Sequence, residues 1–227
     1  MTSPVHTPRL QGAPRPASTW IQAGFWISIL ISVAVVLRRV AAFIHSSQSG
    51  PPDMLQLDRW FRSHEILTLF HIIPALLFVM VTPFVVLGED GSHDTLERCM
   101  YALGAIVGIT AYAMSVYAVG GWVERSAVLV FNSLFLYHLA KAFSFRRAKE
   151  PLRKHIALLR GVAILLGIAT TRPVMGIFFA TSRLTHLGPT QFFGCAFWIG
   201  FAINMIAVEF WVRARYQPIL SADYRSA

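Results

Sequence analysis

Four polar side chains stand inside long apolar stretches of the sequence and are candidates for chemistry: His71, Tyr112, Asn132 and Arg172. A polar group at membrane depth is unfavourable in lipid, so it usually faces protein or a water-filled cavity. Counting about 1.5 Å of rise per residue from the predicted helix ends, all four fall about 10 to 15 Å below the same membrane face. We expect them to form one polar cluster in the outer half of the membrane that binds a small or lipid-like ligand.

Arg172 is the most informative of these residues, because a guanidinium stays protonated and needs an acceptor, an anion or water at that depth. Pro173 follows it and should kink the helix, while Gly176 lets another helix or a ligand come close. The residue has two interpretations. It belongs to a site for an anionic or carbonyl-bearing ligand, or it is satisfied internally by Asn132, Tyr112 or backbone carbonyls.

A second polar group is expected closer to the inner face, formed by His138, Asn204 and Glu209. The histidines also raise the question of haem, which needs two imidazoles at one depth on facing helices. His71 and His138 are about 14 Å apart in depth and cannot share a haem. Hydrogen bonding is the expected role of each histidine, and haem is an alternative without a clean pair of ligands.

The sequence predicts no metal site. The dipeptide His64-Glu65 lacks the second histidine of H-E-x-x-H, and the acidic loop Glu89, Asp90 and Asp94 lacks the order of an EF-hand. A P-loop, a nucleophile elbow and a dinucleotide fingerprint are also missing from the sequence.

The composition indicates which elements position these residues. The chain has 227 residues, of which 55% are hydrophobic and only 14% charged, with a mean hydropathy of +0.55. Such a chain has too little polar surface for a water-soluble globule. We predict an all-α, polytopic transmembrane helical bundle of about six spans. The spans are expected at about 20–37, 64–87, 96–119, 123–143, 156–180 and 191–212.

The predicted organisation is a disordered N-terminal tail at 1–19, a transmembrane domain at 20–213 and a short polar C-terminal tail at 214–227. The segment 38–62 is expected to be a loop with a short interfacial helix around LDRWFR. Cys99 and Cys195 should lie near opposite faces, too far apart to pair.

The formal net charge of +9 is best explained by topology, because the cations lie mainly in loops and at helix ends. Lys and Arg are more frequent on the side that holds the termini, although Arg38 and Arg39 oppose this bias. We therefore expect a protein of the inner (cytoplasmic) membrane with both termini cytoplasmic, in contact with lipid. Nucleic acid is not an expected partner, and protein partners are left open.

Several of these polar residues also match a known pattern. A histidine early in the second span and a proline at its end are matched by His71 and Pro83. A histidine and an arginine that open the fifth span, with a second arginine 12 residues on, are matched by His155, Arg160 and Arg172. In these features residues 60–213 resemble a large bacterial family of multi-pass membrane proteins, catalogued only as a domain of unknown function.

The last helix of that family carries Asn and Glu five residues apart before basic residues, as Asn204 and Glu209 do here. The family's loop motif H-R-x-x-G-R survives only as HDTLER. It keeps His93 and Arg98, whereas Asp94 and Glu97 replace the arginine and the glycine. The resemblance implies the membrane fold and no known substrate.

Four functions are compatible with the sequence. The first is a membrane protein that binds, transports, senses or transforms a ligand at the outer cluster. The second is an oxidoreductase subunit with haem or quinone. The third is an intramembrane cyclase with Glu209 or Glu65 as proton donor. The fourth is a structural or assembly factor, so whether the chain is an enzyme is open.

Overall fold

The structure is a computed structural model that describes residues 19–44, 52–88 and 94–226; at 52–54, 56, 183, 185, 189 and 217–226 only the backbone is described. The described residues form helices and no strand. The helices are α1 (Thr19–Ile44), α2 (Pro52–Ser63), α3 (Glu65–Leu87), α4 (Asp94–Ser115), α5 (Gly121–Arg147), α6 (Pro151–Thr185) and α7 (Pro189–Ser226).

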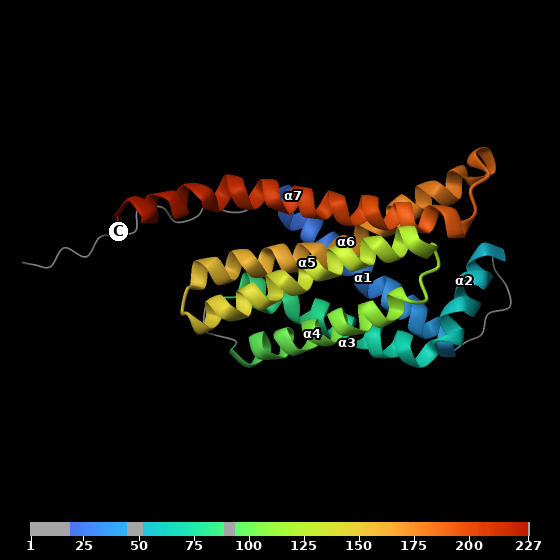
Figure 1. Cartoon of the computed structure of the whole chain (residues 1–227), viewed down its shortest axis with the longest axis horizontal. Coiled ribbons are helices and arrows are strands. Elements are labelled where there is room, and N and C mark those ends of the chain that lie inside the picture. Colours follow the sequence, from blue (N-terminus) through green and yellow to red (C-terminus); the bar gives the residue numbers. More distant parts are fainter. Residues whose placement is uncertain (1–18, 45–51, 89–93, 227) are drawn as a thin grey trace, which may run out of the picture.

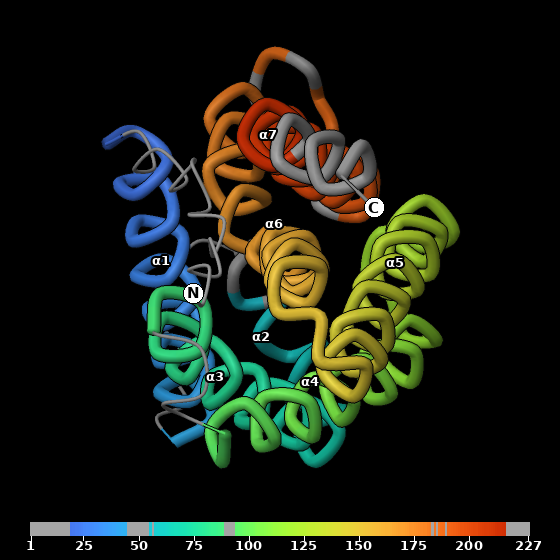
Figure 2. Tube along the Cα trace, turned by 90° about the vertical axis from the view of Figure 1, so that its left-hand side faces the viewer, coloured from blue at the N-terminus to red at the C-terminus, as the bar shows by residue number. Residues whose placement is uncertain are grey.

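The long helices run back and forth along one axis, and the short α2 sits at one end of the bundle (Figure 1). We call this the α2 end. The other is the terminal end, where α1 begins and α7 ends. Viewed from the terminal end, α6 lies at the centre and α1, α3, α4, α5 and α7 surround it (Figure 2).

Five of the described helices are long and apolar enough to cross a membrane: α1, α3, α5, α6 and α7. The remaining long helix, α4, is less apolar because its first turns carry Asp94, Glu97 and Arg98. It nevertheless runs beside α3 and α5 over most of its length and completes the bundle. The prediction of an all-α helical bundle of about six spans is thus confirmed.

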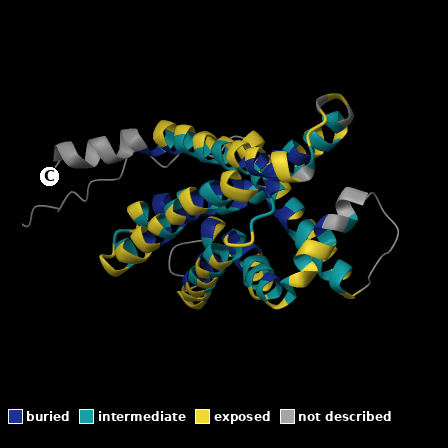
Figure 3. Cartoon of the chain, turned by 45° about the vertical axis from the view of Figure 1, so that its right-hand side comes forward, coloured by how far each residue is buried: buried dark blue, intermediate teal, exposed yellow. Residues whose placement is uncertain are grey.

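Large apolar side chains cover the outside of the bundle, where a soluble protein would carry charges. On α3 the exposed positions Ile66, Phe70, Ile73, Leu77 and Met80 follow one another at intervals of three or four residues. This spacing places them on a single face of α3. Exposed residues also follow the outer sides of other helices of the bundle (Figure 3). An exposed apolar face of this kind is suited to contact with lipid.

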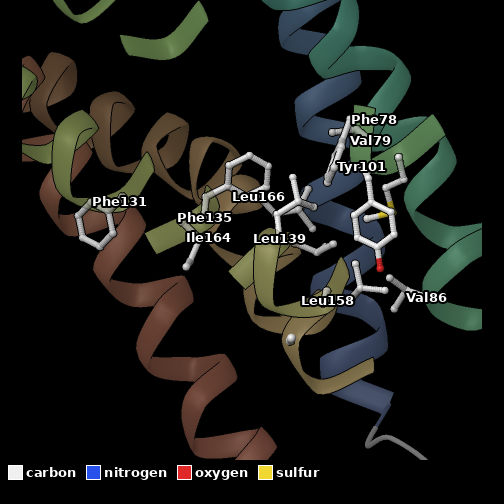
Figure 4. Close-up of a cluster of buried hydrophobic side chains, with 14 of the residues drawn as sticks. Phe78, Val79, Val86, Tyr101, Phe131, Phe135, Leu139, Leu158, Ile164 and Leu166 are labelled. Atoms are coloured by element: carbon white, nitrogen blue, oxygen red, sulfur yellow. The ribbon is translucent and has the colours of Figure 1, made fainter. Parts of the chain in front are cut away.

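A core of packed apolar side chains extends from the middle of the bundle towards the terminal end. Phe78 of α3 and Phe135 of α5 meet edge to face with ring centroids 5.8 Å apart, and Leu139 packs beside them (Figure 4). Gly104 lets α4 approach this cluster, because a Cβ at this position would lie 2.7 Å from Leu139. The interior of this half is therefore filled by side chains.

Glycines also bring α7 against its neighbours. A Cβ at Gly200 would lie 2.7 Å from the backbone nitrogen of Thr171 on α6, and one at Gly194 would lie 2.6 Å from the backbone nitrogen of Glu124 on α5. Larger residues would push the backbones apart. These contacts hold α6 and α5 at fixed distances from α7.

The ends of several helices differ from the sequence-based expectation. α1 continues to Ile44, so Arg38 and Arg39 lie within a helix instead of a loop. α2 covers 12 residues, more than the short helix expected around LDRWFR. α7 continues as a helix to Ser226, through most of the segment expected to be a polar tail. The N-terminal tail expected at 1–19 lies outside the described residues, except for Thr19.

Candidate ligand-binding cavity

A cavity of about 470 Å³ opens in the half of the bundle nearer to α2, and each of the seven described helices contributes to its wall. On α6 its lining extends from Ile164 to Phe179, which corresponds to a length of about 22 Å. Cavities of this volume are in the range of small-molecule sites. The helices that pack tightly around Phe78 and Phe135 thus leave room towards the α2 end.

Arg172 of α6 lines this cavity, and none of the described residues gives it a strong acceptor. Its Nη1 lies 3.8 Å from the sulfur of Met175, which is a weak acceptor, and its Nε is buried with no hydrogen-bond partner. The charged groups whose fields reach it are Arg39, Arg38 and Glu124. The helix continues through Pro173 without a break.

Two further arginines, Arg38 and Arg39 of α1, line the same part of the cavity. Both bind Asp58 of α2, Arg39 at 2.6 Å and Arg38 at 3.4 Å. The guanidinium of Arg39 also lies over the ring of Phe61, 4.1 Å from its centroid. Asp58 therefore ties α2 to α1 and neutralises one of the two arginines.

Glu124 of α5 is a buried acid in the cavity wall. Its Oε2 accepts a hydrogen bond of 2.6 Å from the backbone nitrogen of Gly120, in the turn before α5. Within the described residues no ion pair joins this carboxylate to Arg172. The acid is held by the backbone at the start of its own helix.

The short helix α2 closes the cavity at its end. Leu57 and Phe61 line the cavity, and Leu57 packs with Met175 of α6 and Phe193 of α7. Arg62 donates 2.8 Å and 3.3 Å hydrogen bonds to the carbonyls of Ala42 and Phe43, in the last turn of α1. α2 is thus fastened to the helix that carries Arg38 and Arg39.

The structure brings three of the four residues of the predicted outer cluster to this cavity: His71, Asn132 and Arg172. Nδ1 of His71 lies 2.9 Å from the hydroxyl of Thr110, and Nδ2 of Asn132 donates a 2.8 Å hydrogen bond to the carbonyl of Gly108. Both side chains therefore link their helices to α4, and neither is bound to Arg172.

Tyr112, the fourth residue of that cluster, is not part of the cavity lining. Its hydroxyl lies 2.7 Å from the hydroxyl of Ser133, in an exposed contact between α4 and α5. The neighbouring residue Ala111 does line the cavity. Since consecutive helical residues point about 100° apart, Tyr112 shares the depth of the others but faces another direction.

Away from the arginines the cavity wall is mainly apolar. Phenyl rings come from α5 and α7, where Phe131 and Phe201 stack with centroids 5.2 Å apart. Aliphatic side chains come from α3 and α6, including Val79, Ile164 and Leu165. The cavity thus has a cationic part beside α1 and α2 and an apolar part that extends towards the tight core.

The residues of the predicted inner cluster lie outside the cavity. Glu209 of α7 accepts hydrogen bonds of 2.8 Å and 3.1 Å from Arg160 of α6, and one of 2.7 Å from Arg213. Asn204 bridges to α6 through the hydroxyl of Thr170 at 2.7 Å. The fields of Arg160 and Glu209 also reach His138 on α5. These contacts join α7 to α6.

A second group of charges fastens the terminal end. Glu97 of α4 accepts a 2.9 Å hydrogen bond from Tyr101 and one of 3.2 Å from Lys154 of α6. Arg146 of α5 binds Asp94 and lies 3.6 Å from Glu97. This network is the reason why α4 can carry acidic residues in its first turns. His93 of the altered loop motif lies outside the described residues.

The other histidines have neighbours of different types. His64 stacks on Tyr117 at 4.0 Å between ring centroids, and His155 contacts the ring of Tyr216 at 6.1 Å. His186 adopts the left-handed conformation that ends α6. The haem hypothesis therefore gains no support from the arrangement of these side chains.

Sequence reasoning did not single out Arg38, Arg39 and Glu124 as site residues. The sequence pattern places the two arginines in a loop, where cations act as topology signals. Glu124 lies in the first turn of a predicted helix, where acids are common because the helix dipole favours a negative charge. The signal in the sequence is a carboxylate three residues after Gly121, at the start of a predicted span.

We compared the chain with known proteins by sequence and by structure. No family model, no curated protein and no solved structure matches it. Beyond the fold, the geometry of the cavity is therefore the main guide to function.

Proposed function

We propose that this membrane protein binds an amphipathic, lipid-like molecule in the cavity between α1, α3, α5 and α6. The observation that carries the proposal is Arg172, whose buried Nε has no partner and whose guanidinium reaches an otherwise mainly apolar cavity. A cation at membrane depth needs an acceptor or water. A ligand with a polar head and an apolar body supplies the acceptor and fills the remaining space.

The proposal is tested with a photoreactive probe. The protein is purified in detergent and incubated with hexadecanol that carries an alkyl diazirine, and the labelled peptides are located by mass spectrometry. We expect labelling of cavity-lining residues of α3, α5 and α6 that is reduced by an excess of unmodified hexadecanol. Labelling confined to the outer lipid-facing residues, without competition, would contradict the proposal.

A pair of variants on α4 provides the control. Ala111→Phe places a phenyl group in the cavity wall, whereas Ala102→Phe places the same group on the exposed outer face. The first should remove the competed labelling and the second should leave it unchanged. Equal labelling in both variants would show that the probe does not occupy the cavity.

We also propose that the termini face the cytoplasm and that the α2 end faces outward, in the inner membrane. The support is the concentration of cations at the terminal end, including Arg146, Arg147, Lys149 and Arg153. A C-terminal reporter that is active only in the cytoplasm tests the orientation. Activity only of a periplasmic reporter would reverse it.

The family resemblance also stays a proposal. Arg160 and Glu209, two of the residues on which it depends, bind each other in the structure. Such a pair would give relatives a structural reason to keep both residues.

A further inference from the structure

The cavity contains more cationic than anionic groups. Among the described residues, Arg38, Arg39 and Arg172 contribute three positive charges, whereas Asp58 and Glu124 contribute at most two negative ones. The net formal charge of this group is therefore at least +1. The side chain of Arg38 is 53% exposed, whereas Nε of Arg172 is buried, so the cation that most needs an acceptor, an anion or water is Arg172.

The two carboxylates are already engaged elsewhere. Asp58 binds both Arg38 and Arg39, and Glu124 accepts from the backbone nitrogen of Gly120. Within the described part of the chain, the hydrogen-bond contact of Arg172 is the one with the sulfur of Met175. Arg172 is therefore the arginine of the cavity that no described carboxylate binds.

Open space lies beside this charge. Gly176, one helical turn after Arg172, also lines the cavity, and a Cβ built at Gly176 would meet no atom within 4 Å. Residues four apart share one face of a helix, so the open space and the guanidinium are neighbours. A group the size of a carboxylate can approach the arginine from this side without displacing a side chain.

The apolar part of the cavity begins on the same helix face. From Arg172 to Ile164, the deepest lining residue of α6, the helix rises about 12 Å. Along this length the polar groups His71 and Asn132 are engaged with α4, as described above. The wall therefore offers an apolar surface to a hydrocarbon chain.

Resting on the proposed function, we infer that the ligand is a single-chain amphiphile whose headgroup is a carboxylate or a phosphate. The headgroup binds Arg172 in the space beside Gly176, and the chain extends towards Ile164 and Phe135. A charge-assisted hydrogen bond from a guanidinium to such an anion is favoured over one to a neutral hydroxyl. We expect a preference of about 10- to 100-fold for the anionic amphiphile over a neutral one.

The experiment compares three probes of one chain length in nanodiscs of phosphatidylcholine: palmitic acid, 1-palmitoyl lysophosphatidic acid and hexadecanol. Binding of each radiolabelled probe to the full chain is measured at equilibrium. Tighter binding of either anion than of hexadecanol supports the inference. The tighter of the two anions identifies the source as a fatty acid or a phosphorylated lipid.

Two variants and a control locate the headgroup. Arg172→Leu should bring the anions to the affinity of hexadecanol, and Gly176→Leu should weaken the anions by filling the space beside the guanidinium. Arg125→Leu removes a cation of α5 that lies over Trp122 at 4.8 Å, outside the cavity lining, and should change nothing. An unchanged anion preference in both cavity variants would overturn the inference.

The comparison in the unmodified protein needs no variant to fold. If all three probes bind equally well, the inference of an anionic headgroup is overturned, but the proposed function stands. If none of the three probes binds, the proposed function fails together with the inference.

Discussion

Arg172→Leu is expected to stabilise the protein while it abolishes the preference for anionic ligands. In the ligand-free protein the Nε of Arg172 is a buried donor without a partner, and its Nη1 has only the sulfur of Met175 at 3.8 Å. A buried donor left unsatisfied costs about 1–3 kcal/mol. Leucine removes this penalty and packs against the same apolar wall.

The matched control is Arg160→Leu on the same helix. Arg160 makes two hydrogen bonds with Glu209, and the two side chains are 31% and 34% exposed. Because solvent screens a pair this exposed, its loss should cost about 1 kcal/mol. The same substitution is therefore expected to stabilise the protein at position 172 and to destabilise it at position 160.

The assay is thermal unfolding in neutral detergent, followed by the fluorescence of the six tryptophans. For a chain of this size, 1 kcal/mol shifts the midpoint by about 2–4 °C. If the unfolding midpoint of Arg172→Leu is several degrees higher than that of the unmodified protein, the result supports the conclusion that Arg172 lacks an acceptor in the ligand-free protein. If it falls as far as that of Arg160→Leu, Arg172 is satisfied internally and the reasoning about the ligand is refuted.

Three further perturbations test the framework around the cavity. Gly200→Ala should lower the free energy of unfolding by about 1–3 kcal/mol, because its Cβ would lie 2.7 Å from the backbone nitrogen of Thr171. In the same unfolding assay Gly24→Ala should be neutral or stabilising, because its Cβ would meet nothing within 4 Å. Arg62→Ala should accelerate hydrogen exchange of α2, because it frees the carbonyls of Ala42 and Phe43 on α1. Arg59→Ala removes a hydrogen bond to Leu55 within α2 and should not accelerate it. Glu209→Gln should weaken the contact between α6 and α7 by about 1 kcal/mol and so lower the unfolding midpoint. If the variant is as stable as the unmodified protein, the ion pair contributes nothing to stability.

The existence and type of the long helices could be predicted from the sequence, because a span of about 20 apolar residues has few alternatives. Their ends could not. A pair of arginines at 38–39 is an ordinary stop signal for a membrane helix, yet α1 continues for another turn and more, to Ile44. The structural reason is tertiary: Asp58 and Phe61 of α2 compensate Arg39, so the helix can continue through the charge.

For the candidate site, the depth of each residue in the membrane could be predicted from the sequence, whereas the direction in which its side chain points could not. Counting residues from helix ends places a side chain along the membrane normal, and His71, Asn132 and Arg172 do line one cavity. The direction in which a residue points around its helix depends on how the helices are rotated against each other. This rotation is set by glycine contacts such as Gly108 against Leu136, which the sequence alone does not reveal, and it turns Tyr112 outward.

The contrast between the two halves of the bundle is itself an argument for a binding site. Towards the terminal end, the carboxylates of Glu97 and Glu209 are matched by Lys154 and Arg160 of α6. At the α2 end the same helix α6 carries Arg172, which has no such match, and Gly176, which has open space beside it. The buried Nε atoms of Arg125 and Arg215 also lack a hydrogen-bond partner, but these two guanidinium groups lie over the rings of Trp122 and Trp211, outside the cavity lining. An unmatched cation that faces open space in a cavity is the kind of local conflict expected where stability has been exchanged for function. A ligand that resolves the conflict should therefore raise the unfolding midpoint, and the anion that raises it most identifies the headgroup for which the cavity is built.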